Sequence, residues 1–532
     1  MQHRILTFRA PPQRPPVAGH SPAGRFRGLR KLAVPFTLVT AMAGAAGRSS
    51  AAPGASAGVP KALRVDRAVS LGEAMRLAAT RNLGLLRGAL ERDRVKLGYD
   101  AAWATFLPEL TLNASYANLP PFVVDASSTA STAANQRLAY GANVSWTSPV
   151  GTSLSVGMNT NPHRLTGAAS NSSSLSLTAT QPLLKGGWKA GAANGLAEAA
   201  LDVGIQRALF RQQLEALLAQ VQNAYWALAF AELDVKNRKK TRDRANQQYL
   251  DTKENIRRGI IAKIEIFVVE DNLVFFEQQL MTARQRLALA RRALAQLLQV
   301  AGDSKLSCSD ALGELPAKLP TSATVVAAGL RGNPRLRAEH LRLRKNRVQL
   351  AFQKNQALPS LDLTASFRLN GLDEQYGRHL SQVFSADRPE ATVGLVLTIP
   401  LSWRANRAKV SQAKLGLQRQ LLALKRQEAL VRYQVGDALT NLGFQVRRLR
   451  LAERRLALSK KKLGAEVEKY KNGISTLDVI VRFQRELDQA VLGVRRAQLS
   501  LRQSWASLSQ LLGSQHRRFG IRLGGTSEGA RR

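Results

Sequence analysis

Residues 358–367 read LPSLDLTASF, and residues 107–116 read LPELTLNASY. Each stretch opens with a Leu-Pro pair and continues with apolar residues that alternate with small polar ones, which is the period of a half-buried β-strand. The two stretches lie in different halves of a 532-residue chain. We therefore predict that the chain is built from two related halves.

The sequences around these stretches repeat as well. Upstream, the first copy passes Asn82 and the second passes Asn333. Downstream, the strand regions end at QPL (181–183) and IPL (399–401), and each is followed by a long helical segment that one glycine interrupts, Gly259 or Gly473. Glycine accepts the left-handed backbone that an antiparallel reversal needs. Each half should thus hold entering helices, strands and one long helical hairpin, which is an α+β arrangement.

The long helical segments carry apolar stripes. The clearest runs from Leu421 to Tyr470 with alternating three- and four-residue spacing, and similar spacing occurs over residues 214–235, 273–297 and 487–511. No proline lies between Pro182 and Pro316 or after Pro400, so no proline forces a break in either segment. Helices of this length cannot fold around a core of their own, and the stripes indicate that they lie beside other helices, as in a coiled coil.

Charge almost disappears between the helical segments. From residue 110 to residue 184 only Asp125, Arg137 and Arg164 are charged. Alternation over roughly ten residues, with an apolar face and a small polar face, is typical of membrane barrel strands. A soluble β-sandwich would show the same alternation. The first strand region is longer than the second, and its extra residues could form another hairpin with PVGT (149–152) as its turn, so four and six strands per chain both remain possible.

The N-terminus has the features of an export signal. Residues 1–60 contain basic residues and no acid, and Arg27, Arg30 and Lys31 precede the apolar run 32–46, which contains the small-residue triplet Ala-Gly-Ala at 43–45. No stretch reaches the 18 apolar residues of a transmembrane helix. Cys308 is the only cysteine, which excludes an internal disulfide, and we interpret it as a linker residue.

The formal net charge of +41 does not by itself identify a partner. Basic residues cluster within the helical segments 236–244 and 447–462, where they indicate either solvated outer faces or a face for an acidic partner. The six histidines are scattered, and the sequence has no glycine-rich phosphate loop and no zinc motif. We therefore expect no catalytic site, no cofactor and no metal.

Taken in order, these features resemble the outer-membrane efflux proteins of the TolC family over roughly residues 68–515. The most specific is YKNGISTLDV (470–479), which is similar to the family's periplasmic-tip motif, and RRGIIAKIEI (257–266) is a looser version in the first copy. The resemblance implies a homotrimer whose strands close one outer-membrane β-barrel and whose helices form an α-helical tunnel across the periplasm. It also implies a periplasmic adaptor protein, an inner-membrane transporter and outer-membrane lipid as partners, and no nucleic acid.

The resemblance also assigns roles to residues. It implies a periplasmic gate formed by Asp478 and Glu265. The alternative role of Asp478 is to cap the returning helix, since an acid is favourable near a helix N-terminus. It implies an adaptor-docking tip made of Gly259, Ile260, Gly473, Ile474, Ser475, Thr476 and Leu477. This sequence departs from the family in two places. Val481 occupies a position where relatives often carry a second acid. The first strand region is longer than the second and could hold six strands per chain, whereas the family expectation is four.

We divide the chain accordingly: 1–60 signal peptide and leader, 61–106 N-terminal helices, 107–184 first barrel strand region, 185–303 first long-helix pair, 304–320 linker, 321–357 second set of entering helices, 358–401 second barrel strand region, 402–514 second long-helix pair, and 515–532 basic C-terminal tail. The predicted function is the exit duct of a tripartite efflux or type I secretion system. The alternatives are a basic coiled-coil scaffold or nucleic-acid-binding protein, and a passive barrel channel. The exported substrate cannot be read from the sequence.

Overall fold

A computed structural model describes residues 63–119, 135–164, 169–260, 262–310, 321–375 and 377–521. The predicted signal peptide and leader, residues 1–60, lie outside the described residues. No helix among the described residues has the length and apolar character needed to cross a membrane.

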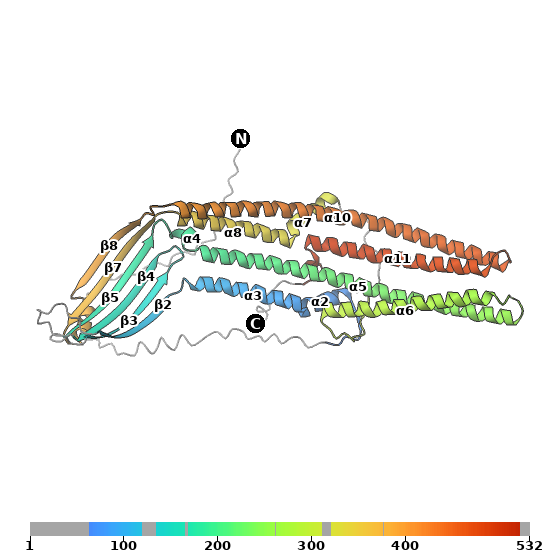
Figure 1. Cartoon of the computed structure of the whole chain (residues 1–532), viewed down its shortest axis with the longest axis horizontal. Helices are drawn as coiled ribbons and strands as arrows, with labels where there is room; N and C mark the ends of the chain where they lie inside the picture. Colours follow the sequence, from blue (N-terminus) through green and yellow to red (C-terminus); the bar gives the residue numbers. More distant parts are fainter. Residues whose placement is uncertain are drawn as a thin grey trace, which may run out of the picture. The chain divides into compact units, whose positions relative to one another are not determined.

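The helices of the two halves correspond one to one in order and length (Figure 1). The first half contains α2 (Leu71–Arg81), α3 (Leu83–Ala104), α5 (Asn194–Arg257) and α6 (Glu265–Leu298). The second half contains α7 (Ser322–Gly332), α8 (Pro334–Gln356), α10 (Arg404–Lys471) and α11 (Leu477–Leu512). α5 has 64 residues and α10 has 68, so the duplication seen in the sequence is a duplication of structure. The short helices α4 (Trp188–Gly191) and α12 (Gln515–Arg518) have no such counterparts among the described elements.

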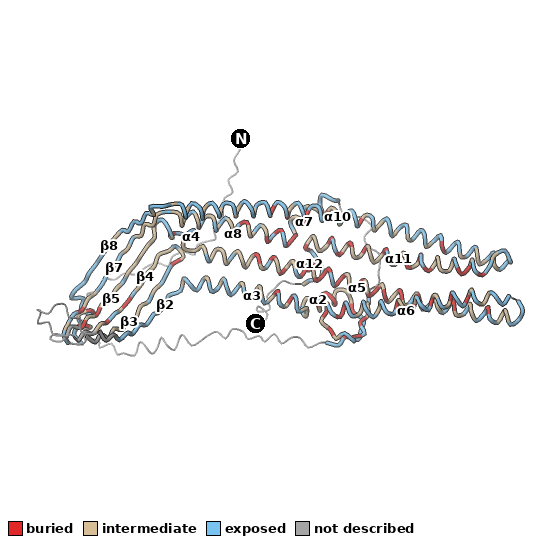
Figure 2. The backbone as a smooth tube through the Cα atoms, viewed as in Figure 1, coloured by how far each residue is buried: buried red, intermediate tan, exposed pale blue. Residues whose placement is uncertain are grey.

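The helices lie side by side in one row. Next to the sheet, the packed neighbours are α3, α5, α8 and α10 in that order, and farther from the sheet they are α6, α5, α11 and α10 (Figure 1). The largest apolar core lies where α2 packs on α5 and α6, around Tyr225, Leu218 and Met75. A second core joins α7, α10 and α11 around Val431 and Val435, and Figure 2 shows how burial concentrates in these regions.

Two asparagines connect the entering helices to the ends of the returning helices. The Asn82 side chain accepts a hydrogen bond from the Leu85 N–H at 3.2 Å, which caps α3, and its Nδ2 donates to the Leu297 carbonyl at 3.1 Å. Asn333 repeats both bonds, with Leu336 at 3.1 Å and with the Leu511 carbonyl at 3.3 Å. One side chain thus satisfies a free N–H at the start of one helix and a free carbonyl at the end of another.

Six strands form one antiparallel sheet in the order β2-β3-β4-β5-β7-β8. The first half contributes β2 (Glu109–Leu119), β3 (Asn135–Thr147), β4 (Ser153–Arg164) and β5 (Ala169–Pro182). The second half contributes β7 (Ser360–Asp373) and β8 (Pro389–Thr398). The described chain therefore has six strands in this sheet, and the family expectation of four is wrong for this protein.

The extra strands form the β3–β4 hairpin, and its turn lies where the sequence allowed one. The Gly151 N–H donates to the Ser148 carbonyl at 2.9 Å, and the Ser148 N–H donates to the Thr152 carbonyl at 2.8 Å. Gly151 has a φ of +95°, a conformation that L side chains rarely adopt. A separate two-stranded parallel pair, β1 (Ala68–Val69) with β6 (Ser307–Cys308), joins the chain before α2 to the linker after α6.

The strand register separates the sheet into an apolar face and a polar face. One row across the apolar face contains Leu110, Val144, Val156, Leu177 and Phe367. The adjacent row on the opposite face contains Thr111, Asn143, Gly157, Ser176 and Arg368. Because side chains alternate along each strand, this register places most of the large apolar residues of the six strands on the same side.

A short helix between β7 and β8, α9 (Arg378–Ser385), packs on β7 and β5 through the buried residues His379 and Val383. It meets the sheet at Gly371, where an added Cβ would lie 1.9 Å from the His379 carbonyl oxygen. Gly371 shares its row with Ser173 and Thr160, whose buried hydroxyls form a 3.0 Å hydrogen bond. This row lies on the apolar side of the sheet, so α9 covers a polar patch that the register places there.

Candidate functional site

The two helical hairpins reverse at the glycines that the sequence singled out. Gly259 has a φ of +77° and Gly473 a φ of +73°. The N–H of the residue after each glycine bonds back to the last turn of the helix, from Ile260 to the Asn255 carbonyl and from Ile474 to the Lys469 carbonyl, both at 2.9 Å. This six-to-one bond with a left-handed glycine defines a Schellman motif, so both tips have the same backbone design.

Apolar side chains are exposed at these tips. Ile260 and Ile474, the residues after the two glycines, are 68% and 76% exposed. Ile264 and Phe267, at the start of the first returning helix, are also exposed. In a Schellman motif the residue after the glycine usually packs back on its helix. Here it does not, and the two tips together present an uncovered apolar surface that the sequence indicated only through Ile260 and Ile474.

The remaining tip residues differ in what they can contact. The Ser475 hydroxyl donates to the Glu466 carboxylate, which holds the second tip to α10. Thr476 precedes α11 without a side-chain cap bond, and it is exposed. Leu477 is 5% exposed and packs inside the hairpin. Of these three residues, Thr476 offers the most accessible surface.

The two acids lie in the first turns of the returning helices. Asp478 is exposed in the first turn of α11, and Glu265 is the half-buried first residue of α6. An acid in the first turn of a helix is favoured by the partial positive charge there. Val481 is buried on the packed face of α11, so position 481 points into the helical hairpin.

An arginine joins the two hairpins near the tips. Arg485 on α11 donates to Asp271 at 2.7 Å and to the buried amide of Asn272 at 3.0 Å, both on α6. Its guanidinium also lies 4.6 Å from the ring centroid of Phe275. Arg485 and Asp271 lie 214 positions apart in the chain, so this contact could not be predicted from local sequence patterns.

A buried ion cluster joins the halves farther from the tips. Arg238 on α5 pairs with Asp488 on α11, and its Nε lies 3.4 Å from the Asp234 carboxylate. All three side chains are at most 8% exposed. Burial raises the pKa of Asp488, and the Arg238 guanidinium offsets part of that effect. The basic run 236–244 is predicted to be either a solvated face or a face for an acidic partner, and both interpretations are wrong for Arg238, which is buried in the helix packing.

The polar face of the sheet is lined by small uncharged side chains over the β3–β4 hairpin. Residues 139–161 contain no Asp, Glu, Lys or Arg. Asn143 and Gly157 lie in one row of this face. In the next row on the same face, Gly141 lies between Asn113 and Asn159. Arg368 and Glu390, 3.8 Å apart, place an ion pair on this face over β7 and β8. Hydroxyl and amide groups on one face with apolar groups on the other suit a sheet that separates water from lipid.

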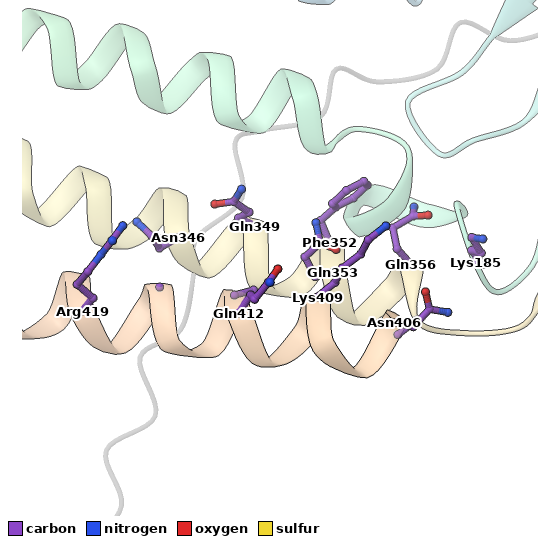
Figure 3. Close-up of a pocket in the computed structure, with 13 residues that line it drawn as sticks. Lys185, Asn346, Gln349, Phe352, Gln353, Gln356, Asn406, Lys409, Gln412 and Arg419 are labelled. Carbon is purple, nitrogen blue, oxygen red and sulfur yellow. The ribbon is translucent and has the colours of Figure 1, made fainter. Parts of the chain in front are cut away.

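A hydrophilic cavity of about 580 Å³ lies between α8 and α10, close to the sheet (Figure 3). Amide side chains, Gln349, Gln353 and Gln412 among them, line it together with Lys409 and Arg419. Its lining residues include no carboxylate, histidine, cysteine or serine. The groups present can bind water or an anion, but they contain no nucleophile with a paired base.

Solved structures with this arrangement of sheet and helices are outer-membrane channels. The Campylobacter jejuni CmeC outer membrane channel superposes with a TM-score of 0.63 at 14% identity, covering 86% of this chain and 90% of that one. The open state of the Neisseria gonorrhoeae MtrE outer membrane channel gives 0.60 at 19% identity, covering 86% and 91%. The Vibrio cholerae outer membrane protein VceC gives 0.61 at 15% identity, covering 83% and 96%. A search of curated protein sequences found no match.

The fold is thus that of outer-membrane channel proteins. Residues 326–514 match the family model described as outer membrane efflux protein. The second half of this chain is thus similar to that family, in agreement with the TolC-family prediction made from the repeated motifs. The location predicted from the sequence, the outer membrane with an extension into the periplasm, agrees with that of these similar channels.

Proposed function

We propose that three copies of this chain form the exit duct of a tripartite export system, which carries substrates from an inner-membrane transporter across the periplasm and the outer membrane. The observation that carries this proposal is that each layer of the chain is open at both edges. Within the described part of the chain, β2 and β8 each have one neighbour in the sheet, and α3 and α10 each have one neighbour in the row of helices next to it. An open strand edge exposes unpaired backbone groups, which lipid cannot satisfy.

Threefold closure removes these open edges at once. β8 of one chain would pair with β2 of the next, and α10 would pack beside α3 and α6 of the next chain. The antiparallel alternation is kept, because the sheet has an even number of strands. The exposed apolar face of the sheet, which includes Leu112, Val393 and Leu395, would then face lipid, and the polar face would line the pore.

We further propose that the adaptor protein docks on the tips of the helical hairpins. Ile260 and Ile474 are exposed, and a large exposed apolar side chain needs a partner to become buried. Both follow a left-handed glycine, so the backbone presents them in the same way at the two tips. Leu477 would support the tip from inside, since it is already buried within the chain.

Asp478 and Glu265 would form the periplasmic gate in this assembly. Threefold symmetry would bring three copies of each acid around one axis, and a ring of carboxylates favours cations. Asp478 would at the same time stabilise the start of α11 through the helix dipole. No observation favours the alternative of a basic coiled-coil scaffold or nucleic-acid-binding protein.

Closure can be tested with cysteine pairs in a Cys308→Ser background, because Cys308 is the only native cysteine. Each variant carries one cysteine on β2 and one on β8, and variants whose two positions lie opposite each other across the subunit boundary should give disulfide-linked trimers. Native mass spectrometry in mild detergent should show the mass of a trimer without cross-linking. Monomers alone, with no cross-link at any register, would refute the trimer.

Docking and gating need separate variants. Ile260→Ser with Ile474→Ser should weaken adaptor binding and leave the trimer intact, while Phe384→Ser, an exposed aromatic on α9, serves as the matched control. Asp478→Asn with Glu265→Gln should lower cation selectivity in a planar bilayer. Glu468→Gln removes an exposed acid at the same tip, and an equal effect from it would argue against the gate.

A further inference from the structure

Four of the six tryptophans of the chain lie where the strands meet the helices. Trp103 is in the last turn of α3, Trp146 is near the end of β3, Trp188 opens α4, and Trp403 precedes α10. The indole ring is apolar and its N–H is polar, so tryptophan collects at the boundary between lipid hydrocarbon and water. In the membrane placement proposed above, on which this inference rests, these side chains mark the periplasmic edge of the hydrocarbon layer.

The hydrophilic cavity between α8 and α10 begins at this boundary. Its lining residue Lys185 lies three positions before Trp188, and Lys409 lies six positions after Trp403. Lys409 is therefore about 9 Å along α10 from Trp403, and its side chain tilts back toward the start of the helix and the strands. Arg419 is about 24 Å along, at the end of the cavity away from Lys185 (Figure 3). Because the headgroup layer is about 5–8 Å thick, the two lysines lie at its level and Arg419 lies beyond it.

The charge of this cavity is not balanced. Lys185, Lys409 and Arg419 line it together with no carboxylate, and none of the three forms an ion pair within the part of the chain that the structure describes. Lys345, which is also on α8 but packs toward α5, is paired with Asp202 at 2.7 Å. A concave surface lined by cations without a counterion attracts anions.

The groups at the membrane end of the cavity suit a phosphate in particular. A lysine ammonium donates three hydrogen bonds and binds phosphate as a point charge. Gln356 and Asn406 lie at the same end, and their amide groups can donate to further oxygens (Figure 3).

We propose that this end of the cavity is a binding site for a phosphate group, held by Lys185 and Lys409. The tryptophans place the two lysines beside the periplasmic leaflet, so the ligand expected there is the headgroup of an anionic phospholipid, and basic pockets between helices bind such headgroups. Free phosphate from the aqueous side has the same chemistry, and the test separates the two sources.

The test is native mass spectrometry of the protein in mild detergent with three ligands: phosphatidylglycerol, diacylglycerol, which lacks the phosphate, and inorganic phosphate. Phosphatidylglycerol should bind at one lipid per chain, and diacylglycerol should not bind. Lys185→Gln with Lys409→Gln should weaken phosphatidylglycerol binding about 25-fold, because each lysine beside an anionic headgroup contributes about fivefold.

Two controls locate the binding. Lys414→Gln with Lys425→Gln removes the same charge from exposed lysines of α10 that do not line the cavity, and this variant should bind like wild type. Arg419→Gln separates the sources of the phosphate. A lipid phosphate held at the lysines should not respond to it, whereas free phosphate can reach the far end of the cavity and should bind more weakly without the guanidinium.

Phosphatidylglycerol binding that requires the two lysines supports the site with a lipid as its ligand, and preferential binding of inorganic phosphate supports it with a free anion. Equal binding of phosphatidylglycerol and diacylglycerol, an equal loss in the Lys414 and Lys425 control, or no binding of either phosphate ligand would overturn the inference. If the double variant does not fold, Lys409→Gln alone should weaken binding about fivefold. The absence of a trimer would refute the proposed function only, because the cavity lies within one chain and lipid binding by that chain still tests this inference.

Discussion

Asn82 and Asn333 make equivalent pairs of hydrogen bonds in the two halves, so the contribution of each bond to stability can be measured separately. Asn333→Ala removes both the cap on α8 and the bond to the Leu511 carbonyl. Asn333→Ser keeps a capping oxygen but is too short to reach across to the carbonyl. The same two substitutions at Asn82 serve as the matched pair, because Asn82 makes the same bonds in the first half.

The expected magnitudes follow from the two bonds. Loss of an N-cap costs about 1 kcal/mol, and loss of a net intramolecular hydrogen bond costs about 1 kcal/mol. Asn333→Ala should therefore destabilise the junction by about 2 kcal/mol and Asn333→Ser by about 1 kcal/mol. Asn333 is 8% exposed and Asn82 is half-buried, so the effects should be larger in the second half.

Hydrogen–deuterium exchange reads this local opening directly. Peptides that cover the start of α8 should exchange about 30-fold faster in Asn333→Ala and about fivefold faster in Asn333→Ser, since 1.4 kcal/mol corresponds to a factor of ten. Peptides from the far tip of α10 are the internal control and should not change. Wild-type exchange in both variants, or equal exchange in Ala and Ser variants, would refute the reasoning about two separate bonds.

Three further outcomes test other parts of the structure. Val156→Arg should block insertion in the outer membrane, since Arg on a lipid-facing strand costs about 2–4 kcal/mol near the midplane. Ser155→Arg lies on the polar face and should insert normally. Outer-membrane fractionation compares the two variants, and equal insertion would contradict the assigned faces. Burial raises the pKa of the Cys308 thiol to about 12. Thiol alkylation of the folded protein should therefore be slow at pH 8, speed up as the pH rises toward that pKa, and become fast on unfolding. Fast labelling of the native protein at pH 8 would argue against this burial. Arg238→Ala leaves the buried Asp234 and Asp488 without their cation and should lower the free energy of unfolding by about 3–5 kcal/mol. Arg238→Lys should lower it less. Denaturant unfolding that matches wild type in both variants would show that the ion cluster contributes little to stability.

Much of the architecture follows from short-range patterns in the sequence. The alternation of apolar and polar residues at 107–116 and 358–367 predicts strands. The three- and four-residue spacing of apolar residues in the long helical segments predicts helices with one packed face. Gly259 and Gly473 are readable because a left-handed reversal after a long helix strongly favours glycine. The possible turn at 149–152 was also visible, and the Gly151 conformation shows why those residues can form it.

The parts that could not be predicted depend on contacts between residues far apart in the chain. Nothing near Arg238 shows that it is buried, because its partner Asp488 is 250 positions away. The bonds of Asn82 and Asn333 to helix ends likewise require that the helix ends meet. The strand number stayed open because alternation shows that a segment can be a strand but not which strand it pairs with. The exposed Phe267 was missed because its apolar character is that of a core residue.

The β3–β4 hairpin leaves the remainder of the chain undisturbed for a geometric reason. One strand leads away from the helices and the next leads back, so the chain re-enters β5 in the direction it would have had without the insertion. The register also keeps Leu110 and Leu177 on the same side of the sheet. A chain with this architecture can therefore gain strands in steps of one hairpin while its rows of helices keep the same order.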